Sequence, residues 1–111
     1  MGLEVALLDG FNTARRCDCS YCARRGAIVV SALLADVDIV QGAVNLSLYR
    51  WGSKTAKHWF CRTCGIYTHH QRRSDPTQYG INVAILDGIN PRDFPYVPWV
   101  DGINHPADNR A

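Results

Sequence analysis

Three cysteines lie within the six residues Cys17-Asp18-Cys19-Ser20-Tyr21-Cys22, and two more occur in Cys61-Arg62-Thr63-Cys64-Gly65. The packing of a hydrophobic core does not require thiols at such close spacing. The total of five cysteines is odd, and a disulfide within the triplet would have cramped geometry. The five sulfurs are therefore the first candidates for metal binding or thiol chemistry.

The rest of the composition is typical of one globular domain. The 111 residues are 47% hydrophobic and 20% charged, which suffices for a modest core and excludes a disordered tail. The net charge of +2 gives no argument for a nucleic-acid partner. No apolar run reaches the ~18–20 residues of a membrane span, and the first residues do not resemble a signal peptide. We expect a single cytoplasmic domain over residues 1–111.

Short apolar or alternating runs bounded by turn residues predict a mostly β domain. The most regular run is Tyr79–Leu86, in which Ile81, Val83 and Ile85 share one face of a strand. Four prolines between Pro91 and Pro106 predict an irregular C-terminal segment, which its apolar residues should keep packed. The other predicted strands are Glu4–Leu8, Ala27–Leu34, Leu46–Arg50, Ala56–Cys61 and Ile66–Gln71, with the cysteine triplet in a loop.

The later pair, Cys61 and Cys64, has the spacing of a zinc knuckle. Two thiolates separated by two residues can bind one ion when the chain folds back, and Gly65 permits that turn. Predicted strands on both sides indicate a β-hairpin. Two cysteines are half of a tetrahedral zinc site.

The triplet Cys17, Cys19 and Cys22 can hold Zn²⁺ on three sides. Three protein ligands with one open position are typical of catalytic zinc, whereas structural zinc is closed by four ligands. Three thiolates leave a net negative charge at the metal. The neighbouring arginines, Arg15, Arg16, Arg24 and Arg25, can offset part of that charge.

Two assemblies fit the five cysteines. In one, Cys19, Cys22, Cys61 and Cys64 form a single closed zinc-ribbon site, and Cys17 is spare. In the other, the triplet forms an open site, and the later pair belongs to a second site that lacks two ligands. Spacing favours the first, and the crowding of three thiols in one loop favours the second.

The two cysteine motifs together resemble the glutathione-dependent formaldehyde-activating enzyme (GFA) family, also called the centromere-protein-V-like domain. The segments that carry the resemblance are Arg16–Cys22 and Lys57–Ile66, supported by Tyr79–Asp87. The resemblance implies an all-β fold of the β-tent type, with small layered antiparallel sheets around zinc-binding cysteine loops.

The resemblance also implies the chemistry. Cys17, Cys19 and Cys22 map onto the catalytic zinc site, and Cys61 and Cys64 onto a structural zinc site. The implied reaction is the reversible addition of glutathione to formaldehyde, a carbon–sulfur lyase reaction. The cofactor would be Zn²⁺, and glutathione would be the co-substrate.

The sequence departs from the family pattern at its start. The family closes its structural zinc with an earlier C-x-C, and no cysteine precedes Cys17. We therefore expect a domain that lacks this segment. Its later pair would be without metal or would borrow a ligand from His58, His69 or His70, although each histidine more commonly has an ordinary packed or exposed role.

Two hypotheses of function remain from the sequence. The favoured one is a zinc-dependent enzyme acting on a thiol adduct of a small aldehyde. The alternative is a non-catalytic, zinc-ribbon-like module that binds a protein or nucleic acid, with a thiol-redox role in third place. Exposed strand edges in a small β domain also make a homodimer an expectation.

Overall fold

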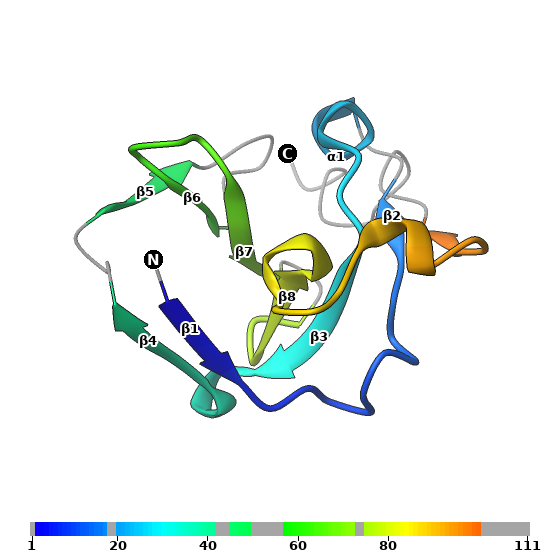
Figure 1. Ribbon diagram of the computed structural model, residues 1–111, viewed down its shortest axis with the longest axis horizontal. Helices are drawn as coiled ribbons and strands as arrows, with labels where there is room; N and C mark the ends of the chain where they lie inside the picture. The colour runs from blue at the N-terminus through cyan, green and yellow to red at the C-terminus, as the bar shows by residue number, and fades with distance from the viewer. Residues whose placement is uncertain (1, 18–19, 42–44, 50–56, 73–74, 101–111) are drawn as a thin grey trace, which may run out of the picture.

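A five-stranded antiparallel sheet forms the centre of the fold (Figure 1). The computed structural model describes residues 2–17, 20–41, 45–49, 57–72 and 75–100. The strands of the sheet follow the order β3–β8–β7–β6–β5. Their bounds are Val29–Leu33 (β3), Gln78–Asn82 (β8), Tyr67–Gln71 (β7), Lys57–Cys61 (β6) and Leu46–Tyr49 (β5).

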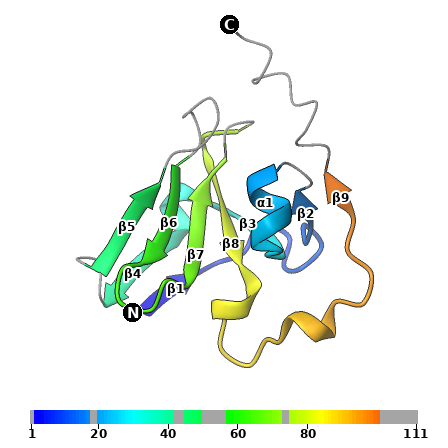
Figure 2. The same cartoon turned by 90° about the horizontal axis from the view of Figure 1, so that it is seen from above.

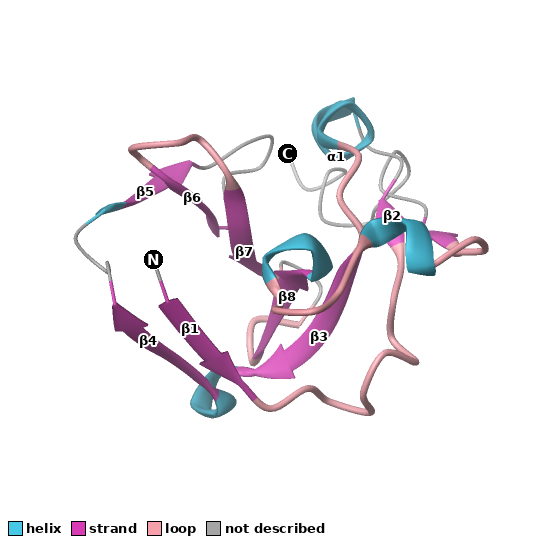
Figure 3. Ribbon diagram, in the orientation of Figure 1, coloured by secondary structure: helices cyan, strands magenta, loops and turns pink. Residues whose placement is uncertain are grey.

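Two small sheets and one short helix accompany this sheet. Strand β1 (Gly2–Val5) pairs antiparallel with β4 (Val37–Gln41), and β2 (Arg16–Cys17) pairs parallel with β9 (Trp99–Val100). Helix α1 spans Ser20–Arg25. Figure 2 shows α1, β2 and β9 on the β3 side of the five-stranded sheet, with β5 at the opposite edge. Among the short cyan segments in Figure 3 are three single-turn 3₁₀ helices, Leu34–Asp36, Val83–Ile85 and Pro91–Asp93.

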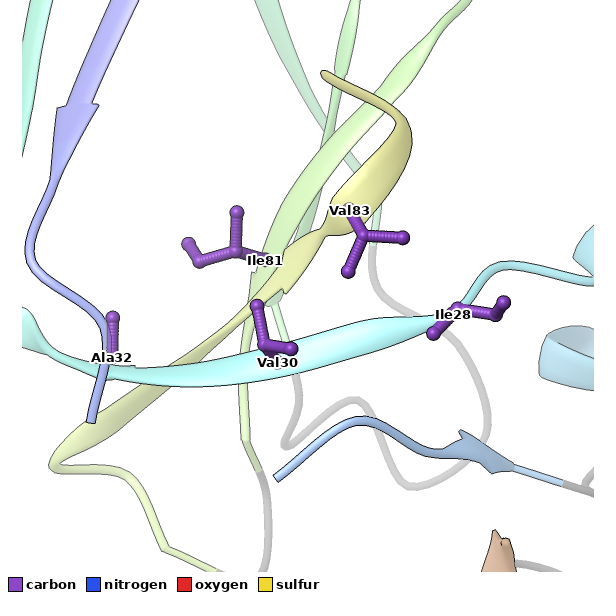
Figure 4. Close-up of a cluster of buried hydrophobic side chains, with 5 residues drawn as sticks. All are labelled: Ile28, Val30, Ala32, Ile81 and Val83. Carbon is purple, nitrogen blue, oxygen red and sulfur yellow. The ribbon is translucent and has the colours of Figure 1, made fainter. Parts of the chain in front are cut away.

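The hydrophobic core lies over the pairing of β3 with β8. Val30 is opposite Ile81 in this antiparallel register. Because successive side chains in a strand alternate between faces, Val30 and Ala32 share one face of β3. Figure 4 shows these side chains together with Ile28 and Val83. All five are 2% exposed or less, so this layer is closed to solvent.

The chain that precedes Cys17 covers the outer edge of β3. Arg15 and Val29 exchange two backbone hydrogen bonds of 3.0 Å each. The backbone N–H of Ser31 donates to Oγ1 of Thr13 at 2.8 Å, and the carbonyl of Ser31 accepts from the N–H of Leu8 at 2.9 Å. Buried backbone groups need such partners. The segment that leads to the cysteine triplet is therefore fixed to the edge of the central sheet.

The all-β prediction is confirmed, with corrections to individual elements. The predicted strand Tyr79–Leu86 ends at Asn82, and the chain turns into a 3₁₀ helix at Val83. The side chain of Asn82 causes this end, because its oxygen accepts from the N–H of Ala84 at 3.1 Å and caps the turn. Strand β1 likewise ends at Val5, well before the predicted Leu8.

The C-terminal segment is packed only in part. Phe94 and Val97 contact the core, whereas Tyr96 is 95% exposed and Trp99 is 55% exposed. The expectation of a packed segment is therefore confirmed for Phe94 and Val97 and wrong for Tyr96 and Trp99, and the part of the segment after Val100 lies outside the described residues. Within the described residues, no helix has the length and apolar character needed to cross a bilayer.

Replacing Val30 with Ala should lower the free energy of unfolding by about 2–3 kcal/mol, because two buried methyl groups are lost and a cavity remains. Chemical denaturation of the wild type and the variant measures this difference. Leu33→Ala, on the same strand but 40% exposed, is the control and should cost less than half as much. Equal losses would contradict this location of the core.

Candidate functional site

Cys17 lies at the end of β2, where the chain enters the cysteine triplet. The N–H of Arg16 donates to the carbonyl of Pro98 at 2.9 Å, and Cys17 pairs with Val100 on β9. The guanidinium of Arg16 lies 5.9 Å from the centre of the Trp99 ring. The C-terminal segment therefore holds the first cysteine of the triplet in place.

Cys22 lies on helix α1, so the prediction that the whole triplet is a loop is wrong. The run Ala23-Arg24-Arg25 favours a helix, and Gly26, at φ +69°, ends it. The N–H of Gly26 donates to the carbonyl of Cys22 at 2.9 Å. Cys19 falls outside the described residues.

Arg25 connects Cys22 to the central sheet. Its Nη2 donates to Sγ of Cys22 at 3.5 Å, one turn back on α1. Its Nη1 lies 3.2 Å from Nδ1 of His58, which is on β6. Its guanidinium carbon lies 3.6 Å from the centre of the Tyr67 ring on β7, a cation–π contact. One side chain thus touches the helix and two strands.

His58 and His70 form a stacked pair beside Arg25. Their ring centres are 5.1 Å apart and the rings are inclined by 24°. Nδ1 of His70 lies 2.5 Å from the hydroxyl oxygen of Tyr67. The backbone of Gly80 lies against the His70 ring, where a Cβ would approach Nδ1 to 2.9 Å. The sheet thus presents a tightly packed imidazole–phenol cluster to the cysteine-bearing helix.

Burial and surrounding positive charge keep His70 neutral. Burial lowers the pKa of His70 well below its usual 6.5, and the positive charges of Arg25, Arg15 and Arg72 lower it further. Burial also lowers the pKa of Arg15 to about 10, helped by Arg72, while Tyr67 and Cys17 oppose the change. Arg15 therefore remains a cation at neutral pH. Its Nη1 donates to the carbonyl of Thr13 at 2.9 Å and to Oγ of Ser31 at 3.0 Å.

His69 points to the other face of β7 and belongs to a separate aromatic group. Its ring stacks on Trp59 at 4.8 Å and meets the edge of Tyr79 at 5.1 Å. Nδ1 of His69 lies 2.8 Å from Oγ1 of Thr68. Burial lowers the pKa of His69 to about 4. His69 is an ordinary packed residue, as expected, with no contact to a cysteine among the interactions described.

Cys61 and Cys64 lie on the turn between β6 and β7, as the knuckle motif predicts. Gly65 has a φ of +78°, and its N–H donates to the carbonyl of Cys61 at 2.7 Å. The pKa of the Cys61 thiol is lowered, first by the N–H of Cys64, then by the thiol of Cys64 and the N–H of Thr63. Cys64 is exposed. The turn brings both sulfurs to one side of the hairpin.

The two cysteine groups lie apart. Figures 1 and 2 both show the β6–β7 turn at a distance from α1 and β2. The four cysteines within the described ranges, Cys17, Cys22, Cys61 and Cys64, are thiols. Within those ranges, no three side chains of His, Cys, Asp or Glu gather in a way that could hold a metal ion. Because Cys19 is not among them, zinc binding by the triplet stays a prediction.

The comparison with known proteins decides the family. Residues 5–97 match the family described as glutathione-dependent formaldehyde-activating enzyme, GFA. The chain belongs to this family. A crystal structure of a Rhodobacter sphaeroides protein, a structural-genomics target, is also similar to this GFA domain. The sequence identity is 67%, the TM-score is 0.86, and the match covers 88% of this chain and 90% of that chain.

The sequence identified the cysteines of this GFA domain but not the side chains that link them to the sheet. Tyr67 carried no signal in the sequence, and His58 was considered either a substitute zinc ligand or, more commonly, an ordinary packed or exposed residue. Arg25 was expected to offset thiolate charge, which agrees with its contact to Cys22. The separation of 33 positions between Arg25 and His58 hides their contact from any local pattern.

Replacing Gly80 with Ala should lower the free energy of unfolding by about 1–3 kcal/mol, because the new Cβ would overlap a ring that packs against His58. Denaturation in urea measures the loss. The same substitution made in a His70→Ala background should cost far less, since the overlapping ring is absent. Equal costs in the two backgrounds would exclude the His70 ring as the cause.

Stability should fall as the pH drops from about 6.5 to about 4, because His69 binds a proton in the unfolded chain but not in the native one. The folded pKa lies below the unfolded value, so this contribution is fully present above pH 6.5. At ~1.4 kcal/mol per pH unit, the total loss is about 3 kcal/mol. The measurement is the free energy of unfolding across this pH range.

His69→Phe is the matched variant for this pH dependence. It keeps a ring between Trp59 and Tyr79 but removes the titrating nitrogen. The slope of stability against pH should therefore be smaller than in the wild type. His70, with the same direction of pKa change, supplies part of the slope that remains. An unchanged slope would show that His69 is not the group responsible.

Proposed function

We propose that this chain is a zinc-dependent carbon–sulfur lyase that catalyses the reversible addition of glutathione to formaldehyde. The observation that carries the proposal is membership of the formaldehyde-activating family over residues 5–97. In the reaction, the glutathione sulfur bonds to the aldehyde carbon and the thiol proton moves to the aldehyde oxygen. The product is S-hydroxymethylglutathione.

The donor set near α1 suits a zinc ion. Cys17 and Cys22 are half-buried thiols at the two ends of the triplet, held by β2 and α1. Thiolate sulfur is a preferred ligand of zinc. Cys17, Cys19 and Cys22 would hold the ion, which when bound lowers the pKa of a coordinated thiol and so favours its thiolate form.

The cations around the triplet have two roles in this proposal. Arg25 donates to Cys22 and Arg15 influences Cys17, so both reduce the electrostatic cost of gathering thiolates. Glutathione is anionic and needs positive partners for its carboxylates. Arg16 is suited to that contact. Its Nε is buried and has no hydrogen-bond partner among the described residues, and a movement of the side chain that exposes this atom would let a carboxylate oxygen satisfy it.

The activity test follows adduct exchange by NMR in a mixture of glutathione, formaldehyde and the zinc-loaded chain. We expect exchange faster than in buffer. Cys22→Ser should reduce the acceleration by about 100-fold or more, since even the loss of an outer-shell partner costs ~10–100-fold. Ala23→Ser places the same hydroxymethyl group at the next, exposed position of α1 and should keep the activity.

Two results would contradict the proposal. The first is exchange at the buffer rate with a fully zinc-loaded chain, which would exclude the glutathione–formaldehyde reaction. The second is full activity in Cys22→Ser, which would place the chemistry outside the triplet.

A further inference from the structure

Arg25 is fixed from the side of the sheet as well as from its own helix. The guanidinium lies on the Tyr67 ring at 3.6 Å, and Tyr67 is 8% exposed. His58, which contacts Nη1 of Arg25, is 6% exposed. His58 in turn stacks on His70, and His70 contacts the Tyr67 hydroxyl. These contacts leave the guanidinium little freedom to move, so the direction of its Nη2 toward Cys22 is also fixed.

The chemistry of the guanidinium fixes the proton of His58. Arginine has only N–H donors and remains charged, so it cannot accept a hydrogen bond. Nδ1 of His58 must therefore accept from Nη1 of Arg25, and the imidazole is neutral with its proton on Nε2. A proton on Nδ1 would remove this hydrogen bond and set two N–H donors against each other. The sheet thus provides a specific acceptor for Arg25.

We propose that Arg25 is a positioning residue that fastens the cysteine-bearing helix to the central sheet and holds Sγ of Cys22 in the orientation needed for zinc. The inference rests on the proposed function, because Cys22 is one of the three zinc ligands proposed there. Arg25 acts through Cys22 and touches neither the metal nor the substrate. Outer-shell partners of this kind orient the ligand and tune the site.

Arg24 provides a comparison on the same helix. It has the same side chain and lies one residue from Arg25, but it is exposed. A general effect of positive charge near the triplet would be shared by both residues. An effect of position would follow the contacts that Arg25 makes with Cys22, His58 and Tyr67.

The first test measures zinc affinity by competition with a chromophoric chelator. Arg25→Gln should weaken binding by about 10- to 100-fold. Arg25→Lys should lie between this variant and the wild type, because an ammonium keeps the charge but lacks the planar fork that reaches two partners. Arg24→Gln should match the wild type. Wild-type affinity in Arg25→Gln, or an equal loss in Arg24→Gln, would overturn the inference.

A second variant keeps the test valid if Arg25→Gln does not fold. His58→Phe keeps the ring that stacks on His70 but removes the acceptor for Arg25. His58→Phe should also weaken zinc binding. In the double variant Arg25→Gln/His58→Phe, the loss of binding free energy for zinc should be smaller than the sum of the losses in the two single variants. Additive losses, or unchanged affinity in His58→Phe, would show that His58 does not position Arg25.

A third measurement needs neither zinc nor activity. Nitrogen-15 NMR of the metal-free wild type should show His58 with the proton on Nε2 and with Nδ1 as an acceptor. A proton on Nδ1 would overturn the inference, whatever the activity. A different outcome would contradict only the lyase proposal. In that outcome the His58 tautomer and the zinc affinities are as expected, but the chain does not accelerate formaldehyde exchange. Arg25 would then still be a positioning residue.

Discussion

The pairing of β3 with β8 is the constraint on which the other parts of the structure depend. One face of β3 supplies Val30 and Ala32 to the core, and Val29 and Ser31 are buried on the other face. A one-residue shift of register would exchange the two faces of β3 and place Ser31 in the apolar layer that Val30 and Ala32 occupy. The outer edge of β3 holds the chain before Cys17, through Arg15 and Thr13. The other edge of β3 pairs with β8, which is followed in the sheet by β7 with His70 and β6 with His58. The core therefore sets the distance between the cysteine helix and the imidazoles.

The protein places several basic groups close together and resolves their repulsion by dividing charge between residue types. The guanidiniums stay protonated, as the pKa of about 10 for Arg15 shows. The imidazole of His70 gives up its proton, as its lowered pKa shows. This division is favourable because a neutral imidazole can accept a hydrogen bond from a guanidinium, as His58 does from Arg25. Buried cations without such acceptors would cost several kcal/mol each.

The sequence predicted the elements whose cause is local and missed those whose cause is distant. The β6–β7 hairpin follows from two short strand-like runs, Ala56–Cys61 and Ile66–Gln71, on either side of a turn whose Gly65 tolerates positive φ, and all of these are visible in the sequence. The end of β8 at Asn82 was missed because the apolar alternation continues through Val83 and Ile85. The Asn82 cap overrides that pattern, while its Nδ2 donates to the carbonyl of Tyr67 across the sheet at 2.8 Å. The short α1 helix was missed because the cysteine spacing was interpreted as a metal loop, although the run Ala23-Arg24-Arg25 favours a helix.

The surroundings of the two cysteine groups explain why they differ chemically. The thiol of Cys61 is affected mainly by backbone N–H groups of its own turn, and Cys64 is exposed. A turn of this kind needs only a few neighbouring residues, so a short motif in the sequence is enough to recognise it. Cys22 instead contacts a side chain that is held by residues on β6 and β7. Its environment exists only once the sheet has formed. The properties of the later pair are thus local, whereas those of the triplet depend on the whole fold, because the sheet orients the group that touches Cys22.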